Sequence, residues 1–177
     1  GGDGPGSRCG GDSGVIWRAL HLLALFWMMA GIGSTVIPMW KAWRSEELET
    51  KSILISDAAR NEPVWLLPGM LAAATTGYAW VASSGWDVLT TGWLVALEAV
   101  FAVNLFIFLP LFGIGLRRVR LLTLQAKKQG EETEELRDAL ADNVLLVFGT
   151  LIMASVPVMV WLPVFKPFSE ERVTAGV

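Results

Sequence analysis

Long apolar stretches dominate this chain, and most of its charged residues fall between them. A helix needs ~20 apolar residues to cross the hydrocarbon core of a bilayer. Four stretches meet this requirement, at residues 16–40, 63–84, 90–116 and 143–165. They are too long for strands and too apolar for the helices of a soluble protein's surface. The pattern therefore predicts an all-α integral membrane protein built as a four-helix bundle.

The predicted layout has three parts. Residues 1–14 are Gly-rich and polar, which indicates a flexible tail. Residues 15–168 form the predicted four-helix transmembrane domain, and residues 169–177 form a C-terminal tail. Cys9 is the only cysteine, so no disulfide can form within the chain.

Local signals mark the ends of two helices. Asn61, followed by Glu62 and Pro63, is a start signal for the second helix. Asp87 or Thr90 is a candidate cap for the third helix, because short polar side chains accept hydrogen bonds from a first turn.

Prolines and small residues predict the shape and packing of the helices. Pro68, Pro110 and Pro157 lie inside the second, third and fourth helices, where each removes a backbone hydrogen bond and favours a bend. Small residues gather at 30–34 in the first helix and at 72–77 in the second. Such residues let helices approach closely, so we expect the first two helices to touch along these stretches.

Positive charges predict the orientation. The connections after the first and third helices carry Lys41, Arg44, Lys51, Arg60, Arg117, Arg118, Arg120, Lys127, Lys128 and Arg137. With four spans these two connections share one side of the membrane, and the other side keeps Arg8, Arg18, Lys166 and Arg172. The positive-inside rule then places both termini on the non-cytoplasmic side.

The connection between the third and fourth helices is itself predicted to be an amphipathic helical hairpin. Residues 117–128 extend the third helix, and Gly130 is a candidate for its C-terminal cap. Residues 131–142 open with glutamates, which suit the positive end of a helix.

Composition narrows the partners. The formal net charge is −3 and no basic patch is interleaved with aromatics, so nothing indicates nucleic acid. The expected partners are the lipid bilayer and other membrane-protein subunits.

Two titratable side chains within the spans are candidates for chemistry. His21, the only histidine, could ligate haem iron, a pigment magnesium or copper, or it could form a hydrogen bond across the bundle. Glu98 lies about two turns into the third helix, at a depth similar to that of His21. The pair could share a proton or a ligand if their helices face each other; otherwise Glu98 reaches the interface or stays protonated. Asn104 lies on another side of the third helix from Glu98 and so faces a different neighbour, with which we expect it to form an interhelical hydrogen bond.

Several short motifs, in order, resemble a bacterial superfamily of four-helix membrane proteins. They are Trp17–His21 followed by Trp27 and Ala30–Gly31, then Leu67–Met70 and Gly77, then Gly92–Leu94, and finally Lys166–Phe168. The superfamily includes the J-type protoporphyrinogen oxidases, copper-resistance D-type proteins and an uncharacterised family of predicted integral membrane proteins. The overall pattern is most similar to the uncharacterised family. The resemblance implies a bacterial inner membrane or a membrane derived from it.

The resemblance also implies site residues. In the J-type oxidases a first-helix histidine is tied to haem binding, which corresponds to His21, and a second-helix methionine corresponds to Met70. Their lysine early in helix three is replaced by Leu97 or its neighbour Glu98. Their fourth-helix Asn-Glu-x-Pro motif is not reproduced, and Asn143 alone corresponds to it.

Three functions remain open from the sequence. The first is a non-catalytic subunit of a larger respiratory or photosynthetic-type membrane complex, which needs the fewest special residues. The alternative is a protein that binds haem or another tetrapyrrole, with His21 as axial metal ligand and Met70 and Glu98 as further cofactor contacts. The third is proton or metal transport through His21 and Glu98.

Overall fold

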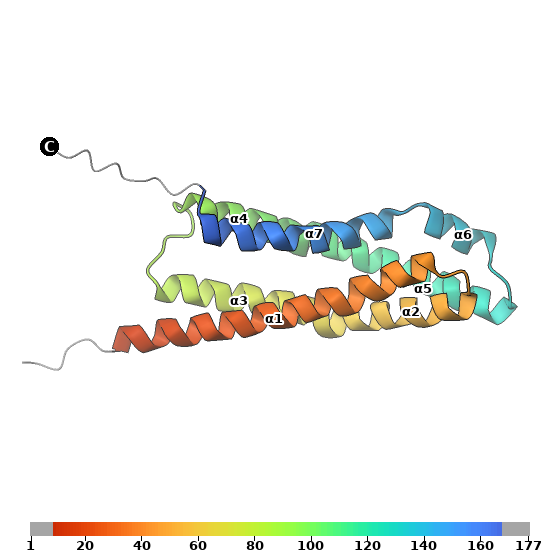
Figure 1. Ribbon diagram of the computed structural model, residues 1–177, viewed down its shortest axis with the longest axis horizontal. Helices are drawn as coiled ribbons and strands as arrows, with labels where there is room; N and C mark the ends of the chain where they lie inside the picture. The colour runs from red at the N-terminus through yellow and green to blue at the C-terminus, as the bar shows by residue number, and fades with distance from the viewer. Residues whose placement is uncertain (1–8, 168–177) are drawn as a thin grey trace, which may run out of the picture.

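A computed structural model describes residues 9–167, and these residues are helical with short connections (Figure 1). The elements are α1 (Cys9–Arg44), α2 (Leu48–Asn61), η1 (Glu62–Leu66), α3 (Leu67–Ser83), α4 (Gly92–Val103), η2 (Asn104–Phe108), α5 (Leu109–Gln129), α6 (Glu134–Ala141) and α7 (Val144–Phe165). The elements η1 and η2 are single π-helical turns. Residues 1–8 of the predicted tail at 1–14 lie outside the described residues, and so does the predicted tail at 169–177. The rest of the first predicted tail is helical, because α1 begins at Cys9.

Four helical rods are long and apolar enough to span a membrane, at Gly14–Arg44, Leu48–Ser83, Gly92–Gln129 and Glu134–Phe165. The fourth rod is interrupted at residues 142–143, between α6 and α7. The predicted all-α four-helix membrane bundle is therefore confirmed. The two central rods have 36 and 38 residues. At 1.5 Å per residue they are ~55 Å long, whereas the hydrocarbon core is ~30 Å thick. Each rod therefore extends well beyond the hydrocarbon.

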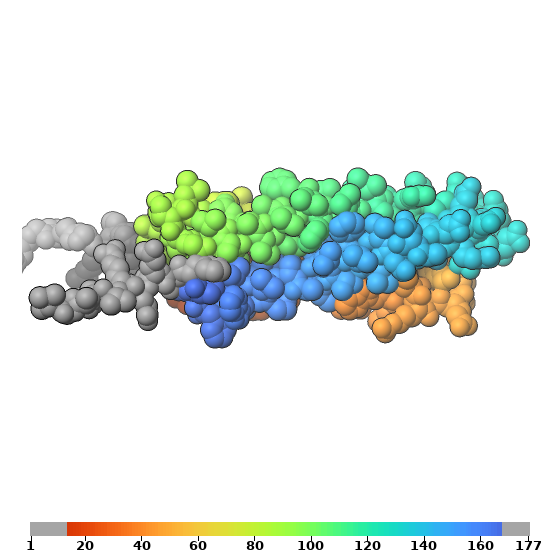
Figure 2. Space-filling model, turned by 90° about the horizontal axis from the view of Figure 1, so that it is seen from above, coloured from red at the N-terminus to blue at the C-terminus, as the bar shows by residue number. Residues whose placement is uncertain are grey.

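The rods form two layers along one long axis (Figure 1). In one layer α1 packs against α2 and α3, and in the other α7 packs against α4 and α5, while α2 and α5 join the layers. Seen from above, the rods of the second layer run side by side along the elongated molecule (Figure 2). The beginning of α1, the α3–α4 connection and the end of α7 share one end, called here the terminal end.

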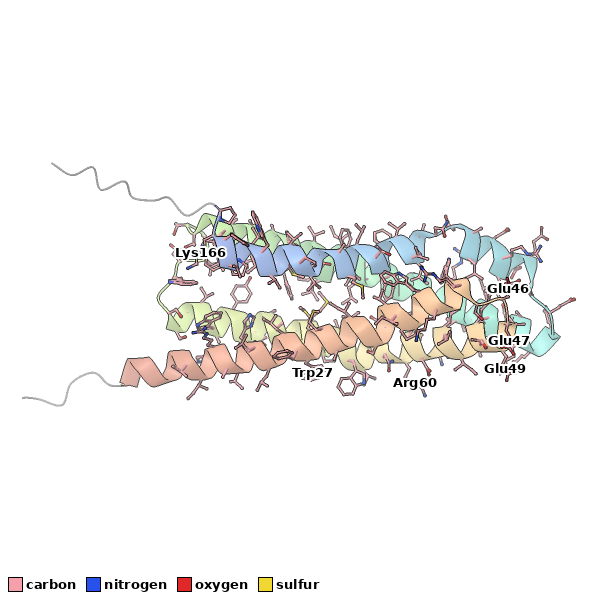
Figure 3. All side chains as sticks on the ribbon, in the orientation of Figure 1. Trp27, Glu46, Glu47, Glu49, Arg60 and Lys166 are labelled. Carbon is pink, nitrogen blue, oxygen red and sulfur yellow. The ribbon has the colours of Figure 1, made fainter. Side chains whose placement is uncertain are left out.

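The opposite end, called here the charged end, holds both basic connections. It contains the α1–α2 connection, the end of α5 and the short helix α6. Glu46, Glu47 and Glu49 lie there, whereas Lys166 lies at the terminal end (Figure 3). This arrangement agrees with the prediction that the two basic connections share one side.

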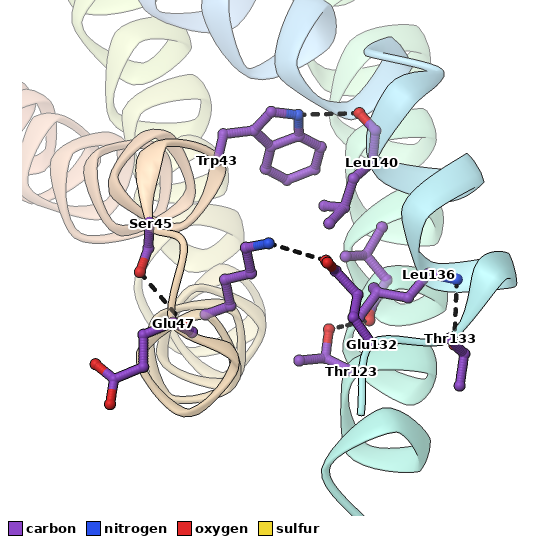
Figure 4. A network of polar contacts seen from close by, with 10 residues as sticks. Trp43, Ser45, Glu47, Thr123, Glu132, Thr133, Leu136 and Leu140 are labelled. Carbon is purple, nitrogen blue, oxygen red and sulfur yellow. Dashed lines mark hydrogen bonds and ion pairs between the residues drawn. The ribbon is translucent and has the colours of Figure 1, made fainter. Parts of the chain in front are cut away.

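The predicted hairpin between the third and fourth spans is present. Gly130 ends α5 in the left-handed conformation, at φ 79°, and donates its amide to the Ala126 carbonyl. Thr133 caps α6 by accepting a hydrogen bond from the Leu136 amide, and the Leu136 side chain is fully buried. Several side-chain contacts hold the hairpin to the first layer, and Figure 4 shows two of them. Lys51 forms a 2.9 Å ion pair with Glu132, and the Trp43 indole donates to the Leu140 carbonyl over 3.1 Å.

The predicted cap of the third helix is wrong. Thr91 is the N-cap of α4, and its side chain forms no capping hydrogen bond. Asp87 instead accepts a 3.0 Å hydrogen bond from the Leu89 amide, inside the α3–α4 connection. The Asp87 carboxylate is therefore bonded within its own turn, before the helix begins. Aspartate side chains often bond in this way to an amide two residues further along the chain.

Two of the predicted proline distortions are π-helical turns. The residue before each of Pro68 and Pro110 donates its amide to a carbonyl five positions earlier. Leu67 donates to Glu62 in η1, and Leu109 donates to Asn104 in η2. A proline ring would collide with the carbonyl four residues earlier, and that carbonyl lies inside the widened turn in both cases. Pro157 lies inside α7, which is unbroken.

The predicted start of the second helix at Asn61 is wrong, and the Asn61 side chain instead serves a fourth proline, Pro38. Asn61 does not begin a helix, because the rod already starts at Leu48. Its side chain donates a 3.1 Å hydrogen bond to the Ser34 carbonyl on α1. That carbonyl lies four residues before Pro38, which has no N–H to donate to it. Asn61 thus replaces a missing backbone donor in a neighbouring helix.

Small residues do bring α1 and α3 together, but not in the predicted register. A Cβ atom at Gly31 would lie 2.7 Å from the Leu66 Cα, and one at Gly69 would lie 2.9 Å from the Met28 Cα. Because the two helices are antiparallel, each predicted small-residue stretch packs against a different part of its partner. The glycines let the two backbones touch, which larger side chains would prevent.

The Asn61 contact predicts a coupling between two substitutions. Asn61→Ala should lower the free energy of unfolding by about 1–3 kcal/mol, because it leaves the Ser34 carbonyl unpaired in an apolar environment. In a Pro38→Ala background the residue 38 amide can donate to that carbonyl, so the loss should shrink. Equilibrium unfolding in detergent of the four members of the double-mutant cycle measures this. Equal losses in both backgrounds would contradict it.

Candidate functional site

His21 lies on α1 and faces α3. Its Nδ1 is 3.2 Å from the Thr76 hydroxyl, and its ring packs over Gly77, whose added Cβ would lie 3.1 Å from the imidazole. The Thr76 hydroxyl donates to the Ala72 carbonyl over 2.6 Å. A hydroxyl that donates to Ala72 can accept a hydrogen bond from an imidazole that carries its proton on Nδ1, and this tautomer has its lone pair on Nε2.

An aromatic chain runs from His21 to the second layer. Its ring centroids are 5.8 Å apart between His21 and Trp80, 6.4 Å between Trp80 and Trp86, and 5.3 Å between Trp86 and Trp93. The Lys166 ammonium lies 5.2 Å from the Trp86 ring and 5.7 Å from the Trp93 ring. Edge-to-face aromatic pairs and cation–π contacts are both attractive at these distances. The chain therefore ties the α1–α3 pair to α4 and to the end of α7.

Met70 does not lie beside His21. It is buried on α3, seven positions from the Gly77 that contacts His21. That separation is ~10 Å along a helix with a rise of 1.5 Å per residue. Two axial ligands of one iron must approach it from opposite sides of the same macrocycle, and this register does not bring His21 and Met70 into that relation.

Glu98 lies half-buried on α4, which packs against α7. Within residues 9–167 its side chain forms no hydrogen bond and no ion pair. His21 instead contacts α3, so the structure does not bring together the His21–Glu98 pair on which the transport hypothesis depends.

The most deeply buried acid of the described chain is Glu62, which sequence reasoning had placed at a helix start. It is 5% exposed, and its carboxylate lies 3.6 Å from the Arg117 guanidinium on α5. Gly113 makes room for it, since a Cβ there would lie 3.2 Å from the Glu62 carboxylate. The spacing from a proline could have indicated that Glu62 is a special position. Glu62 and Asn104 each lie six residues before a proline within an apolar rod.

Asn104 forms the predicted interhelical hydrogen bond. The Ser155 hydroxyl on α7 donates to its Oδ1 over 3.0 Å, and its side-chain Nδ2 donates to the Val100 carbonyl over 2.8 Å. It also lies at the floor of a groove of about 430 Å³ between α4–η2 and α7. The groove is lined by Ala99, Val100, Val103, Asn104, Phe108, Leu151, Ala154 and Ser155.

The part of the chain that is described holds no group of three or more His, Cys, Asp or Glu side chains arranged for a metal ion. Within the same residues, every buried side-chain nitrogen or oxygen has a hydrogen-bond partner.

Residues 15–167 match the DUF2269 family, described as predicted integral membrane proteins. The chain belongs to this family. The match confirms the resemblance to an uncharacterised membrane family, and it extends from the start of the first span to the end of the fourth. No curated protein and no solved structure matches the chain. The family description carries a location in the membrane and no reaction.

The buried acid of this family member allows a direct test. Arg117→Gln should lower the free energy of unfolding by about 1–2 kcal/mol, since it leaves the Glu62 carboxylate in the bundle without its cation. The loss should largely disappear in a Glu62→Gln background. Arg120→Gln is the matched control, because Arg120 is exposed on the same helix. Thermal unfolding in detergent measures all four variants, and a loss that persists without the Glu62 charge would refute the pairing.

Proposed function

We propose that this protein is a non-catalytic integral membrane subunit of a larger membrane complex of respiratory or photosynthetic type. The observation that carries the proposal is the groove between α4–η2 and α7, which has small residues on both walls. The proposed occupant is a transmembrane helix of another subunit.

The walls of the groove fit a helix. Ala99 on α4 and Ala154 on α7 are both exposed, so neither is used in packing the described bundle. Small side chains let a second backbone approach closely, which is the main source of helix association in lipid. Asn104 and Ser155 at the floor bond to each other, so the surface that the groove presents to a partner is apolar. Two larger side chains of the lining, Val103 and Leu151, are also exposed and extend the apolar contact surface.

The same proposal includes an orientation. The charged end carries the ten basic residues of the two connections, which by the positive-inside rule face the cytoplasm of a bacterial cell. Both termini are then non-cytoplasmic. The helices that project from this end give a complex an additional surface outside the bilayer.

Filling the groove tests the subunit proposal. Ala99→Trp and Ala154→Trp should each reduce co-purification of a larger assembly in mild detergent by about tenfold, because the indole occupies the space of the partner helix. Ala30→Trp is the matched control, an exposed alanine of α1 outside the groove. Native-membrane pulldown with size analysis measures the effect. A wild-type protein that leaves its own membrane as an isolated monomer contradicts the proposal.

A second function is favoured by the arrangement at His21. We infer that a haem or other tetrapyrrole binds with the His21 Nε2 atom as its axial ligand. Thr76 orients the imidazole through Nδ1, and such a second contact fixes the tautomer and the direction of the ligating lone pair. The aromatic rings of Trp80 and Trp86 continue from the imidazole and would contact a flat macrocycle.

The spectrum of the protein tests this second function. Protein purified gently from its own membrane should show visible absorbance that is lost in His21→Ala. Thr76→Val should weaken binding of added haem by about tenfold or more, because the imidazole loses its orienting partner. Thr75→Val is the matched control, since the exposed Thr75 hydroxyl bonds only to carbonyls of its own helix. A colourless protein that stays colourless with added haem removes this function.

A further inference from the structure

A second pocket, of about 570 Å³, opens at the charged end between α5 and the junction of α6 with α7. Its volume falls within the ~300–1,000 Å³ typical of small-ligand sites. Its lining includes Arg118 and Val119 from α5, Asp138 and Asp142 from the α6 side, and Val144 and Leu145 from the first turn of α7. Neither of the proposed functions above uses this pocket.

The three charged side chains of this pocket have no partners in the described chain. Arg118, Asp138 and Asp142 form no side-chain hydrogen bond and no ion pair within residues 9–167. Nearby charges behave differently, because Lys51 pairs with Glu132 at 2.9 Å and Lys127 with Glu49 at 3.7 Å. One cationic and two anionic groups thus line a single cavity without neutralising one another.

The pocket lies beside the ends of two apolar stretches of the chain. The third apolar stretch ends at residue 116, directly before the basic residues, and the fourth begins at residue 143. Charged Arg118, Asp138 and Asp142 and apolar Val144 and Leu145 therefore meet at the depth of the lipid headgroups. An occupant of this pocket can place a polar group against the charges and an apolar chain toward the bilayer.

We propose that this pocket binds a zwitterionic phospholipid through its phosphoethanolamine headgroup. Arg118 takes the phosphate, for which a guanidinium offers paired N–H donors. Asp138 and Asp142 take the primary ammonium group. They lie four residues apart, so their side chains share one face, and an ammonium has three N–H donors to distribute between them.

The same charges exclude other headgroups. A choline headgroup has no N–H to donate to Asp138 and Asp142. A glycerol headgroup has no cation for these carboxylates, and a serine headgroup adds a carboxylate that they repel. A free phosphoethanolamine ester has the right polar chemistry, but it leaves Val144 and Leu145 uncovered. The membrane lipid is therefore the source that we propose.

Lipid retention measured by native mass spectrometry tests the proposal. The full chain is incorporated into nanodiscs containing equal phosphatidylethanolamine and phosphatidylcholine, and the lipids retained on release are counted. The wild-type protein should prefer phosphatidylethanolamine, and Asp138→Asn with Asp142→Asn should lower that preference by about tenfold. Glu135→Gln is the matched control, an exposed acid of α6 that does not line the pocket.

Two further arms separate the contributions. Arg118→Gln should weaken both lipids alike, because both carry the phosphate, whereas Arg120→Gln should change neither. Soluble glycerophosphoethanolamine should fail to displace the bound lipid. Equal retention of the two lipids by the wild-type protein, an unchanged preference in the double aspartate variant, or displacement by the soluble ester would each overturn the proposal. Gel filtration of every variant confirms that the compared proteins are folded.

Discussion

The lack of hydrogen-bond partners in hydrocarbon is the constraint on which this structure depends. A backbone group that leaves its helix in lipid must find another partner within the protein. The chain nevertheless carries prolines in all four rods, and it resolves them in different ways. Pro68 and Pro110 are preceded by π-helical turns that keep the backbone bonded at a longer spacing. Pro38 has no N–H to donate to the Ser34 carbonyl, and the Asn61 side chain from the next rod donates to that carbonyl instead.

These compensations also place the polar side chains of the bundle. Glu62 and Asn104 each begin a π-helical turn and are almost completely buried. Each of them contacts another rod, Glu62 through Arg117 on α5 and Asn104 through Ser155 on α7. Each irregular turn therefore carries a buried polar side chain that joins two rods. Elsewhere, close glycine contacts such as that of Gly69 with Met28 hold the helices.

The candidate sites lie at different levels of one elongated bundle. The aromatic chain from His21 to Trp93 is at the terminal end, the groove floored by Asn104 is lined by α4, η2 and α7, and the pocket with Arg118 is at the charged end. Each level offers a different chemistry to its surroundings. The first presents an imidazole and indoles, the second presents small apolar side chains, and the third presents charges at the depth of the headgroups.

The sequence by itself determined the number of spans, the amphipathic hairpin and the shared end of the basic connections. This was possible because the transfer of a helix into lipid depends on the composition of its own ~20 residues and not on the helices that pack beside it. It also indicated His21, Glu98 and Asn104 as polar groups within the spans. Only the tertiary structure decided which side chains meet. His21 contacts Thr76 and not Glu98, and Met70 lies about two turns away from His21. Asn61, which was expected to start a helix, donates a hydrogen bond to the Ser34 carbonyl. Partners depend on helix register, and antiparallel apolar helices with scattered small residues can pack in several registers of similar composition. The physical choice among these registers is made by backbone contact at Gly31 and Gly69 and by the hydrogen bonds that the prolines require, neither of which is a property of one segment alone.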